Sequence, residues 1–517
     1  MDLAHEGRDG KLVERLVLLV SLIVLLMQSS VRPMEADEMY GYFTAAEPSA
    51  WAVLRTQMSA PISLDPPTYQ LLSHGTMDVV GANSLGARLP SILGFLLMQW
   101  CLFVFVRRLA GVWAGWFAMI FPLATYTLHY AAQGRPYGWL LGMYGAALVC
   151  WQAAARREDE GIDEDRFWIL VGLGAALVGA ITSHFFGLLI LIPICAAELA
   201  RTFTRRKLDP GVLTAIAVGI ASVATLLPFK AAVTIYREHY YTKMPGVRTV
   251  SLAYRRLFLE YPSSWGLGAQ RNALIVLTAF VLGVFALAWL RFRKRPAGEP
   301  MADWVAVAVL AALPFFGYAF ALVVTKTIEV RYVMPALLGL TILLALGLQP
   351  IFQKPAGAKI ALGTVVVAAM VSIGGIGLMD LAARTALRQE MAHISDSGNG
   401  ETLYTVDMGK FVTHWFYADD ALRGRLTYVY SQEREIALMD HDVNYLTAIF
   451  MSKMAPTVRV ASYEQFLEDS SDGTASLVVV YPDSGWDWMP RELRESSASV
   501  TPLGTALGGS LERVVVR

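Results

Sequence analysis

Residues 88–108 have the sequence RLPSILGFLLMQWCLFVFVRR, and this stretch decides the fold. No residue from 89 to 106 is charged, while Arg88 stands at one end of the run and Arg107 and Arg108 stand at the other. A helix of about 20 predominantly apolar residues is long enough to cross the roughly 30 Å hydrocarbon core of a membrane. The stretch therefore predicts a transmembrane helix with basic residues at both of its ends.

The composition of the whole chain also indicates a membrane protein. Of its 517 residues, 55% are apolar and only 17% are charged, whereas an ordinary globular protein carries about 25% charged residues. Lys+Arg and Asp+Glu balance at 43 each, which excludes both a disordered chain and a strongly basic protein that binds nucleic acid. The three cysteines all lie inside apolar runs, so they form neither a disulfide framework nor a CxxC metal motif.

Apolar runs on either side of residues 88–106 predict eleven transmembrane helices in all. They lie near 16–31, 88–106, 112–129, 136–155, 167–183, 184–200, 211–229, 272–291, 302–324, 332–350 and 359–379. The first run is short and follows Arg8, Lys11 and Arg15, a pattern that a signal peptide also shows. We favour a retained signal anchor, because no A-x-A cleavage site follows the run and Pro33 is badly placed for cleavage.

The basic residues predict the orientation of these helices. Lys and Arg are numerous in one alternating set of short loops, whereas the opposite set holds only Arg135, Lys326 and Arg331. Because short cytoplasmic loops are enriched in Lys and Arg, we expect a cytoplasmic N-terminus and a multi-pass protein of the cytoplasmic (inner) membrane. With eleven helices, everything after about residue 380 then lies outside.

This arrangement predicts two domains: a transmembrane domain over 1–380 and an external, periplasmic domain over 381–517. The first has two long external loops, about 32–87 and 230–271, and the second loop is rich in basic and aromatic residues, among them Tyr241, Tyr261 and Trp265. In the C-terminal part, strand-like runs at 401–406, 426–430, 457–461 and 476–481 alternate with helix-like pieces. We therefore expect an all-α polytopic membrane protein with a small external α/β domain.

Three carboxylates follow the first predicted helix, in the segment Glu35-Ala-Asp37-Glu38-Met-Tyr40. In a helix, Asp37 shares a face with Tyr40, and Glu38 is turned about 100° away. Only one of these two adjacent carboxylates can therefore point into a given cavity. The structural alternative is that Asp37 caps a helix at the membrane interface.

Further polar residues stand where other predicted helices meet the external side. Asp65-Pro-Pro-Thr-Tyr69 is either part of a cavity or a plain helix start. The second interpretation is possible because proline fixes φ and Asp can cap a helix. Arg88 is either an interfacial anchor or a contact for a lipid phosphate. Both interpretations fit the sequence.

Two more external corners are candidates. Gln133-Gly-Arg135-Pro-Tyr137 places a basic residue against the positive-inside rule, so we expect Arg135 to pair with an acid or a phosphate. His184 is a lone histidine, and such a residue is more often hydrogen-bonded within the structure than bound to a ligand. Charged groups near hydrocarbon cost a few kcal/mol each, so Lys326 and Arg331 form either a functional cluster or internal ion pairs with Glu329.

The sequence contains no HExxH motif, no P-loop and no GxSxG motif. We expect no cofactor and no metal site, although a cage of Asp and Glu side chains could hold a divalent cation. The polar candidates come from separate loops, yet all fall on the predicted external side. This convergence indicates an outward-facing site.

The order of these motifs resembles that of a known superfamily. Asp37-Glu38 with Tyr40, Pro66-Pro-x-Tyr69, Arg88-Leu-Pro-Ser, Arg135-Pro-Tyr, His184-Phe-Phe and Arg331-Tyr-x-x-Pro follow one another along the chain. The set resembles the multi-spanning glycosyltransferases with a C-type fold that use lipid-linked sugars, such as protein O-mannosyltransferases, lipid A aminoarabinose transferases and rhizobial lipopolysaccharide-core transferases. The resemblance covers about residues 12–350 and is strongest over 36–142.

The resemblance implies roles for individual residues. Asp37 looks like the general base that deprotonates an acceptor hydroxyl, with Glu38 as its neighbour in the motif. The basic residues expected to bind the donor phosphate are Arg88, Arg135, Arg331 and Lys326, and those expected to line the substrate cavity are Asp65, Tyr69, Gln133, Tyr137 and His184. Asp65 stands where many relatives have His, and Gln133 stands where many have Glu. The loss of that second acid weakens any metal-assisted chemistry.

The implied reaction transfers a sugar from a polyprenyl-phosphate donor to an acceptor hydroxyl at the outer face of the membrane, with inversion at the anomeric carbon. Its partners are this donor, a glycan, lipid or protein acceptor and membrane lipids, and no nucleic acid. The alternatives are a transporter or lipid-carrier flippase and a non-catalytic receptor. Transporters usually carry polar groups near mid-membrane, whereas the predicted helices here are almost free of charge at their centres.

Overall fold

The computed structural model describes residues 3–236, 238–240, 245–260, 266–296, 298–396, 400–470, 476–481, 484–495, 498–506 and 509–515. Tyr241, Tyr261 and Trp265 of the predicted loop lie outside these residues. The chain forms two compact units, which we call the bundle unit (residues 1–30, 88–226 and 244–378) and the sheet unit (residues 31–87, 227–243 and 379–517). Each unit is built from segments that are far apart in the sequence.

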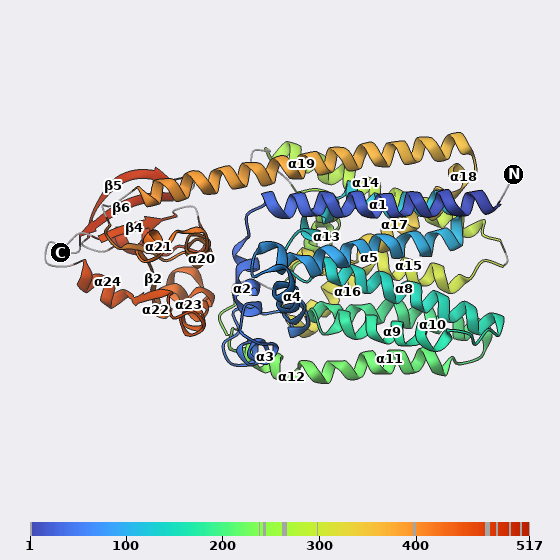
Figure 1. The fold of residues 1–517 in the computed structure, drawn as a ribbon, viewed down its shortest axis with the longest axis horizontal. Helices are drawn as coiled ribbons and strands as arrows, with labels where there is room; N and C mark the ends of the chain where they lie inside the picture. Colours follow the sequence, from blue (N-terminus) through green and yellow to red (C-terminus); the bar gives the residue numbers. More distant parts are fainter. Residues whose placement is uncertain are drawn as a thin grey trace. The chain divides into compact units, whose positions relative to one another are not determined.

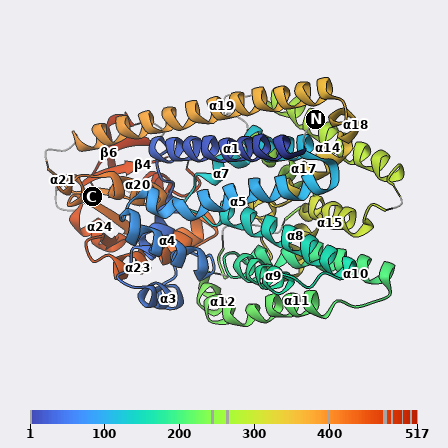
Figure 2. The same ribbon diagram turned by 45° about the vertical axis from the view of Figure 1, so that its right-hand side comes forward.

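The bundle unit is made of helices that lie alongside one another (Figures 1 and 2). Its helices are α1 (Leu3–Val31), α5 (Ser84–Ala110), α6 (Val112–Ile120), η1 (Phe121–Ala124), α7 (Thr127–Ala131), α8 (Tyr137–Glu160), α9 (Arg166–Ile181), η2 (Phe185–Ile190), α10 (Leu191–Arg205), α11 (Pro210–Ser222), η3 (Val223–Leu226), α13 (Arg248–Phe258), α14 (Leu267–Arg293), α15 (Met301–Ala311), α16 (Leu313–Phe320), η5 (Ala321–Thr325), η6 (Val330–Val333), α17 (Ala336–Gly347), α18 (Gln349–Phe352) and most of α19 (Pro355–Ser395). Helix α9 packs against both α8 and α11, and α15 packs against α10 and α17.

The apolar helices confirm a multi-pass membrane protein. Within the described residues, six helices are long and apolar enough to cross a membrane, and a seventh is added if the bent pair 301–311 and 313–325 is one span. Shorter apolar helices cover 112–124, 166–181 and 336–347. All eleven predicted ranges are mainly helical, but 112–129, 302–324 and 332–350 are each divided into shorter helices. The number of eleven crossings stays a prediction.

Helices α5 and α8 cross at a point where neither backbone leaves room for a side chain. A Cβ atom on Gly138 would collide with the backbone oxygen of Ser91, and one on Gly142 would meet the backbone oxygen of Gly94 at 2.5 Å. The Gly138 amide donates a hydrogen bond to Ser91 Oγ at 3.2 Å. Glycine thus sets the distance between α5 and the start of α8, where Arg135 and Tyr137 stand.

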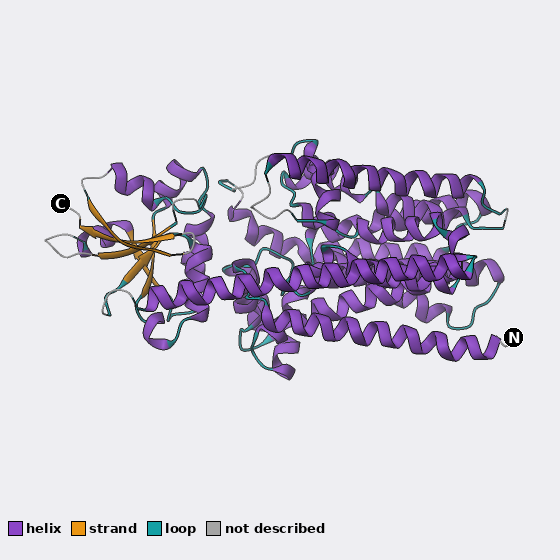
Figure 3. Cartoon of the chain, turned by 90° about the horizontal axis from the view of Figure 1, so that it is seen from above, coloured by secondary structure: helices purple, strands orange, loops and turns teal. Residues whose placement is uncertain are grey.

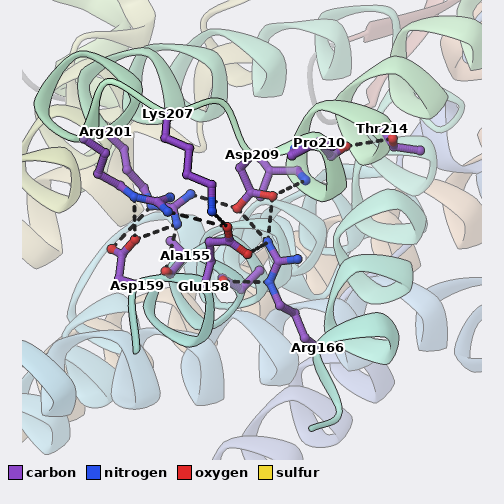
Figure 4. Close-up of polar contacts among 12 residues, drawn as sticks. Ala155, Glu158, Asp159, Arg166, Arg201, Lys207, Asp209, Pro210 and Thr214 are labelled. Carbon is purple, nitrogen blue, oxygen red and sulfur yellow. Dashed lines mark hydrogen bonds and ion pairs between the residues drawn. The ribbon is translucent and has the colours of Figure 1, made fainter. Parts of the chain in front are cut away.

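Ion pairs tie together the neighbouring ends of α8, α9, α10 and α11 (Figure 4). Arg201 donates to Asp159 Oδ1 at 2.8 Å and to Asp209 Oδ2 at 2.9 Å, and Arg166 donates to Asp209 at 2.6 Å. Burial alone would raise the pKa of Asp209, but the hydrogen bonds from Arg166 and Arg201 outweigh it and hold the pKa below its ordinary value. Basic residues that were counted for the predicted orientation are thus paired, and the orientation itself stays a prediction.

The sheet unit contains the predicted small α/β fold (Figure 3). Its strands are β1 (Leu403–Thr405), β2 (Leu426–Tyr430), β3 (Arg459–Ser462), β4 (Ser476–Val480), β5 (Ser499–Ala506) and β6 (Gly509–Val515). The sheet order is β3-β2-β1-β4-β6-β5, in which the first four strands are parallel and β6 and β5 are antiparallel additions. Strands β1 to β4 lie where the sequence predicted them, and β5 and β6 were missed.

Helices cover both faces of this sheet. Leu403, Leu426 and Leu477 pack with residues of α20 and α23 in one core, and Val429, Val478 and Val480 pack with residues of α24 and α25 in another. The helices of the sheet unit are α2 (Ala36–Ala45), α3 (Ala50–Ser59), α4 (Pro67–Val80), α12 (Leu227–Val233), η4 (Thr234–Tyr236), the end of α19, α20 (Met408–Tyr417), α21 (Asp420–Arg423), α22 (Gln432–Met439), α23 (Val443–Met454), α24 (Tyr463–Asp469) and α25 (Met489–Glu495). The predicted external loop 32–87 therefore belongs to the same compact unit as the C-terminal fold.

The α5–α8 crossing makes a testable prediction. We expect Gly138→Ala to destabilise the detergent-solubilised protein by about 1–3 kcal/mol, because the added methyl group would force two backbones apart. Thermal unfolding followed by circular dichroism measures the effect. Gly174→Ala is the matched control, because a Cβ atom there meets nothing within 4 Å; an unchanged midpoint for Gly138→Ala would contradict the proposed role of this glycine.

Candidate active site

The carboxylates of the first motif lie on α2, and two of them form its N-terminal cap. Glu35 is the N-cap residue, and its amide donates a hydrogen bond to Glu38 Oε2 at 3.1 Å. Glu38 is only 1% exposed. Asp37 is the second residue of the helix, so the alternative that Asp37 is the cap is wrong.

A buried arginine holds the start of α2. Arg32, which is 5% exposed, forms an ion pair with Glu35. Burial by itself would lower the pKa of Arg32, but the charges of Glu38, Glu35 and Asp380 outweigh it and raise the pKa above its ordinary value. Arg32 and Asp380 could not be predicted from the sequence, because Asp380 lies on a segment of α19 that is distant in the sequence.

Asp37 faces the same side of α2 as Tyr40, as predicted, and both residues are half-buried. Burial raises the pKa of Tyr40 well above its ordinary value, and the nearby charges of Asp37 and Asp407 add to this effect. The capping contacts of the helix are made by Glu35 and Glu38 rather than by Asp37. Of the two carboxylates in the motif, Asp37 is therefore the better candidate for chemistry.

Asp65 and Tyr69 stand at the start of α4, and hydrogen bonds give both a structural role. Pro66 is the N-cap residue and Pro67 the first residue of the helix, which agrees with a helix start set by proline. The backbone carbonyl of Asp65 accepts a hydrogen bond from Gln57 Nε2 at 2.9 Å. The buried Tyr69 hydroxyl donates to the carbonyl of Ala87 at 3.0 Å.

In the bundle unit, two of the predicted arginines converge on one tyrosine. The guanidinium carbon of Arg135 lies 5.9 Å from the ring centre of Tyr137, and that of Arg331 lies 5.8 Å from the same ring. Both arginines are half-buried, and Tyr137 is buried. Guanidinium groups are attracted to the face of an aromatic ring at such distances. Tyr137 thus brings together two cations that are almost two hundred positions apart in the chain.

A third arginine, Arg256 on α13, belongs to the same neighbourhood. Burial raises the pKa of Tyr130 to about 12, and the charges of Arg256 and Arg331 oppose that rise. Arg256 forms an ion pair with Glu260. Burial would lower the pKa of Arg256, but the charges of Tyr130 and Glu260 raise it above its ordinary value. The rings of Tyr130 and Tyr137 meet edge to face, with centres 5.6 Å apart. The sequence analysis counted Arg256 only as one of the basic residues of loop 230–271.

His184 is buried beside this group and has a structural role. Its Nδ1 accepts a hydrogen bond from the amide of Phe186 at 3.1 Å, which caps η2. Its ring centre lies 6.0 Å from that of Tyr137 and 4.6 Å from that of Tyr332. The histidine therefore helps to hold Tyr137 in place, in agreement with the structural interpretation of its sequence.

The other predicted cations have different surroundings. Arg88 is fully buried and donates to the carbonyl of Ser29 at 2.7 Å, where the last turn of α1 leaves carbonyl groups without helical partners. Lys326 is exposed, and its ammonium group donates to the carbonyl of Leu322 at 2.7 Å. Among the described residues, Glu329 forms no ion pair with Lys326 or Arg331. The backbone amide of the buried Gln133 donates a hydrogen bond to the carbonyl of Tyr130 at 3.3 Å.

The predicted site residues thus belong to two different units. Those of the sheet unit are Asp37, Glu38, Asp65 and Tyr69, and those of the bundle unit are Arg88, Gln133, Arg135, Tyr137, His184, Lys326 and Arg331. Within the described ranges, no group of three or more His, Cys, Asp or Glu side chains could hold a metal ion. The chemistry available is that of three arginines around two tyrosines, which suits an anionic group, and of a half-buried carboxylate, which suits a base.

Comparisons with known proteins give a family match over part of the chain and a shared fold. Residues 65–229 match the family of dolichyl-phosphate-mannose-protein mannosyltransferases. The fold is similar to that of ArnT from Cupriavidus metallidurans, both bound to undecaprenyl phosphate (TM-score 0.59, 14% identity, 96% of this chain and 97% of that chain covered) and in the apo state (TM-score 0.59, 16% identity, 98% of each chain covered). The search of curated proteins gives no match. Residues 65–229 are therefore similar to this family, and the chain as a whole shares the fold of ArnT.

Proposed function

We propose that this protein transfers a sugar from a polyprenyl-phosphate donor to an acceptor hydroxyl at the outer face of the cytoplasmic membrane. The observation that carries the proposal is the group of Arg135, Arg256 and Arg331 around Tyr130 and Tyr137. Undecaprenyl phosphate is the ligand of the similar ArnT structure, and the matched family is named for a lipid-phosphate sugar donor. Both support a lipid-linked donor.

The arginine group is assigned to the donor phosphate. When the bond between the anomeric carbon and the phosphate oxygen breaks, the leaving polyprenyl phosphate gains negative charge and needs cations rather than a proton. Guanidinium groups bind phosphate through two parallel hydrogen bonds, and fixed charges stabilise such a leaving group most where water is scarce. Tyr137 and His184 keep two of these arginines at fixed positions. A contact of Arg88 or Lys326 with the phosphate stays a prediction.

Asp37 is assigned as the general base. The acceptor hydroxyl loses its proton to the carboxylate as its oxygen bonds to the anomeric carbon, and the sugar leaves the phosphate in the same step. A single base opposite the leaving group gives inversion. Glu38 is assigned as a positioning residue, because its carboxylate caps α2 and faces Arg32.

The first test of this assignment is Asp37→Asn. We expect it to lower kcat for transfer by about 10²- to 10⁴-fold, because general-base catalysis typically contributes this much. The assay uses the purified protein in liposomes with synthetic undecaprenyl-phosphate-linked hexoses and pentoses and an envelope extract as acceptor. Mass spectrometry measures the undecaprenyl phosphate that is released.

Glu38→Gln is the matched control, because Gln at this position still supports a capping box. We expect it to lose less than about tenfold in kcat, the equivalent of one weakened hydrogen bond. An Asp37→Asn protein as fast as the wild type would overturn the base assignment. A wild-type protein that moves these lipids across the bilayer but transfers no sugar from any of them would identify it as a flippase instead.

The second test concerns the phosphate. We expect Arg256→Gln and Arg331→Gln each to weaken binding of undecaprenyl phosphate by about 10- to 100-fold, because a hydrogen bond to a charged group contributes about 1.5–3 kcal/mol. Titration of the detergent-solubilised protein with undecaprenyl phosphate, followed by native mass spectrometry, measures the affinity. Arg271→Gln is the control, an exposed basic residue of the same predicted loop. Equal losses for all three variants would mean unspecific attraction by basic residues.

A further inference from the structure

We propose that helix α20 of the C-terminal α/β fold is a seat that positions α2, and through α2 the carboxylate of Asp37. The role of Asp37 as base comes from the function proposed above, whereas the seat itself rests on contacts within the sheet unit. Helix α20 packs directly against α2. Their contacts occur at both ends of α2.

The first contact is a close approach at the N-terminal ends of the two helices. A Cβ atom on Gly409 would lie 3.6 Å from the Cβ atom of Ala36 and 3.4 Å from Asp407 Oδ1. There is thus space for a methyl group at Gly409 and for little more. Ala36 directly precedes Asp37, so anything that pushes on Ala36 moves the candidate base.

The second contact is a cluster of aromatic rings at the C-terminal ends. Tyr42 meets Phe416 edge to face, with ring centres 5.2 Å apart, and Phe43 meets Trp415 in the same way at 5.6 Å. Aromatic pairs in this arrangement are more favourable than their buried area alone predicts. In addition, the amide of Met34 donates a hydrogen bond to the Tyr417 hydroxyl at 2.7 Å. Contacts at both ends fix the direction of α2 as well as its place.

The start of α20 is itself fixed by the sheet. Asp407 follows β1 and caps α20 by accepting a hydrogen bond from the amide of Lys410 at 2.9 Å, and it accepts a second one from the Ser484 hydroxyl at 2.6 Å. Ser484 follows β4, and the strand order reverses between β1 and β4. In open parallel sheets, functional groups gather at this point, where the carboxyl ends of two neighbouring strands diverge. Here this point of the sheet anchors α20, the helix that forms the seat.

Such a seat matters because a general base must lie within hydrogen-bond reach of the proton that it removes. A displacement of about 1 Å from the productive geometry can cost about 100-fold in rate. A short helix that follows a long one has little to fix its direction by itself. The seat supplies this constraint, so the C-terminal fold acts on the chemistry without contacting the substrate.

Substitutions of graded size at Gly409 test the proposal in the full-length protein. Both Ala and Leu favour helix more than Gly does, so neither weakens α20 itself. We expect Gly409→Ala to retain transfer activity, whereas Gly409→Leu loses about 100-fold in kcat with an unchanged KM for the donor. Hydrogen exchange of amides 39–45 is the second measurement, and we expect it to become faster only in Gly409→Leu.

These outcomes separate the seat from the proposed function. If the wild type transfers no sugar but Gly409→Leu still accelerates exchange in α2, the function fails and the seat stands. If the wild type transfers sugar and Gly409→Leu keeps both its kcat and its α2 protection, the seat is overturned. If Gly409→Leu loses protection from hydrogen exchange throughout the sheet, this variant is unfolded. Variants of Asp407 then test the proposal.

Variants of Asp407 test whether α20 positions α2 without adding a larger side chain. Asn caps helices about as well as Asp, and its amide group can donate to the Ser484 hydroxyl. We expect Asp407→Asn to keep transfer and α2 protection, whereas Asp407→Ala loses both. The seat is overturned if Asp407→Asn is as slow as Asp407→Ala while α2 stays protected, because the charge of Asp407 would then act on the reaction directly.

Discussion

The buried guanidinium group of Arg32 determines how the carboxylates of α2 are used. A charge removed from water must be paired, and breaking such a pair leaves the other charge unpaired at a cost of about 3–5 kcal/mol. Glu35, Glu38 and Asp380 supply the opposite charges around Arg32. Since Glu35 and Glu38 also cap the helix, they are committed to holding α2. The remaining carboxylate of the segment, Asp37, lies on the adjacent face with Tyr40 and is the proposed base.

The same constraint applies to the cations of the bundle unit. Arg88 and Arg201 are buried, and protein groups occupy their hydrogen-bonding positions. Arg135 and Arg331 are instead half-buried beside the ring of Tyr137, and Arg256 is half-buried and ion-paired with Glu260. Guanidinium groups in such surroundings are suited to an anionic ligand. The aromatic surroundings of Arg135 and Arg331 support the assignment of the phosphate site.

Much of the fold could be predicted from the sequence, because membrane helices and parallel strands are encoded by local apolar runs. The eleven apolar ranges are mainly helical, although three of them are divided into shorter helices, and β1 to β4 lie in the predicted segments. Strands β5 and β6 were missed because they are polar and alternate weakly. In the candidate site, motif order predicted Arg135, Tyr137 and Arg331, which lie together in the structure, while the role of Asp37 stays a prediction. Arg32, Arg256 and Asp407 could not be found in this way, because their importance comes from contacts between distant segments.

Those long-range contacts mean that the first motif cannot work as an isolated segment. Helix α2 is short, and its neighbours in the sheet unit include Asp380 and Tyr417, which are more than three hundred positions away. A short helix in water gains most of its stability from packing rather than from its own propensity. The sheet unit must therefore fold before α2 has a defined direction. It follows that the C-terminal fold and the motif near the N-terminus belong to one structural unit.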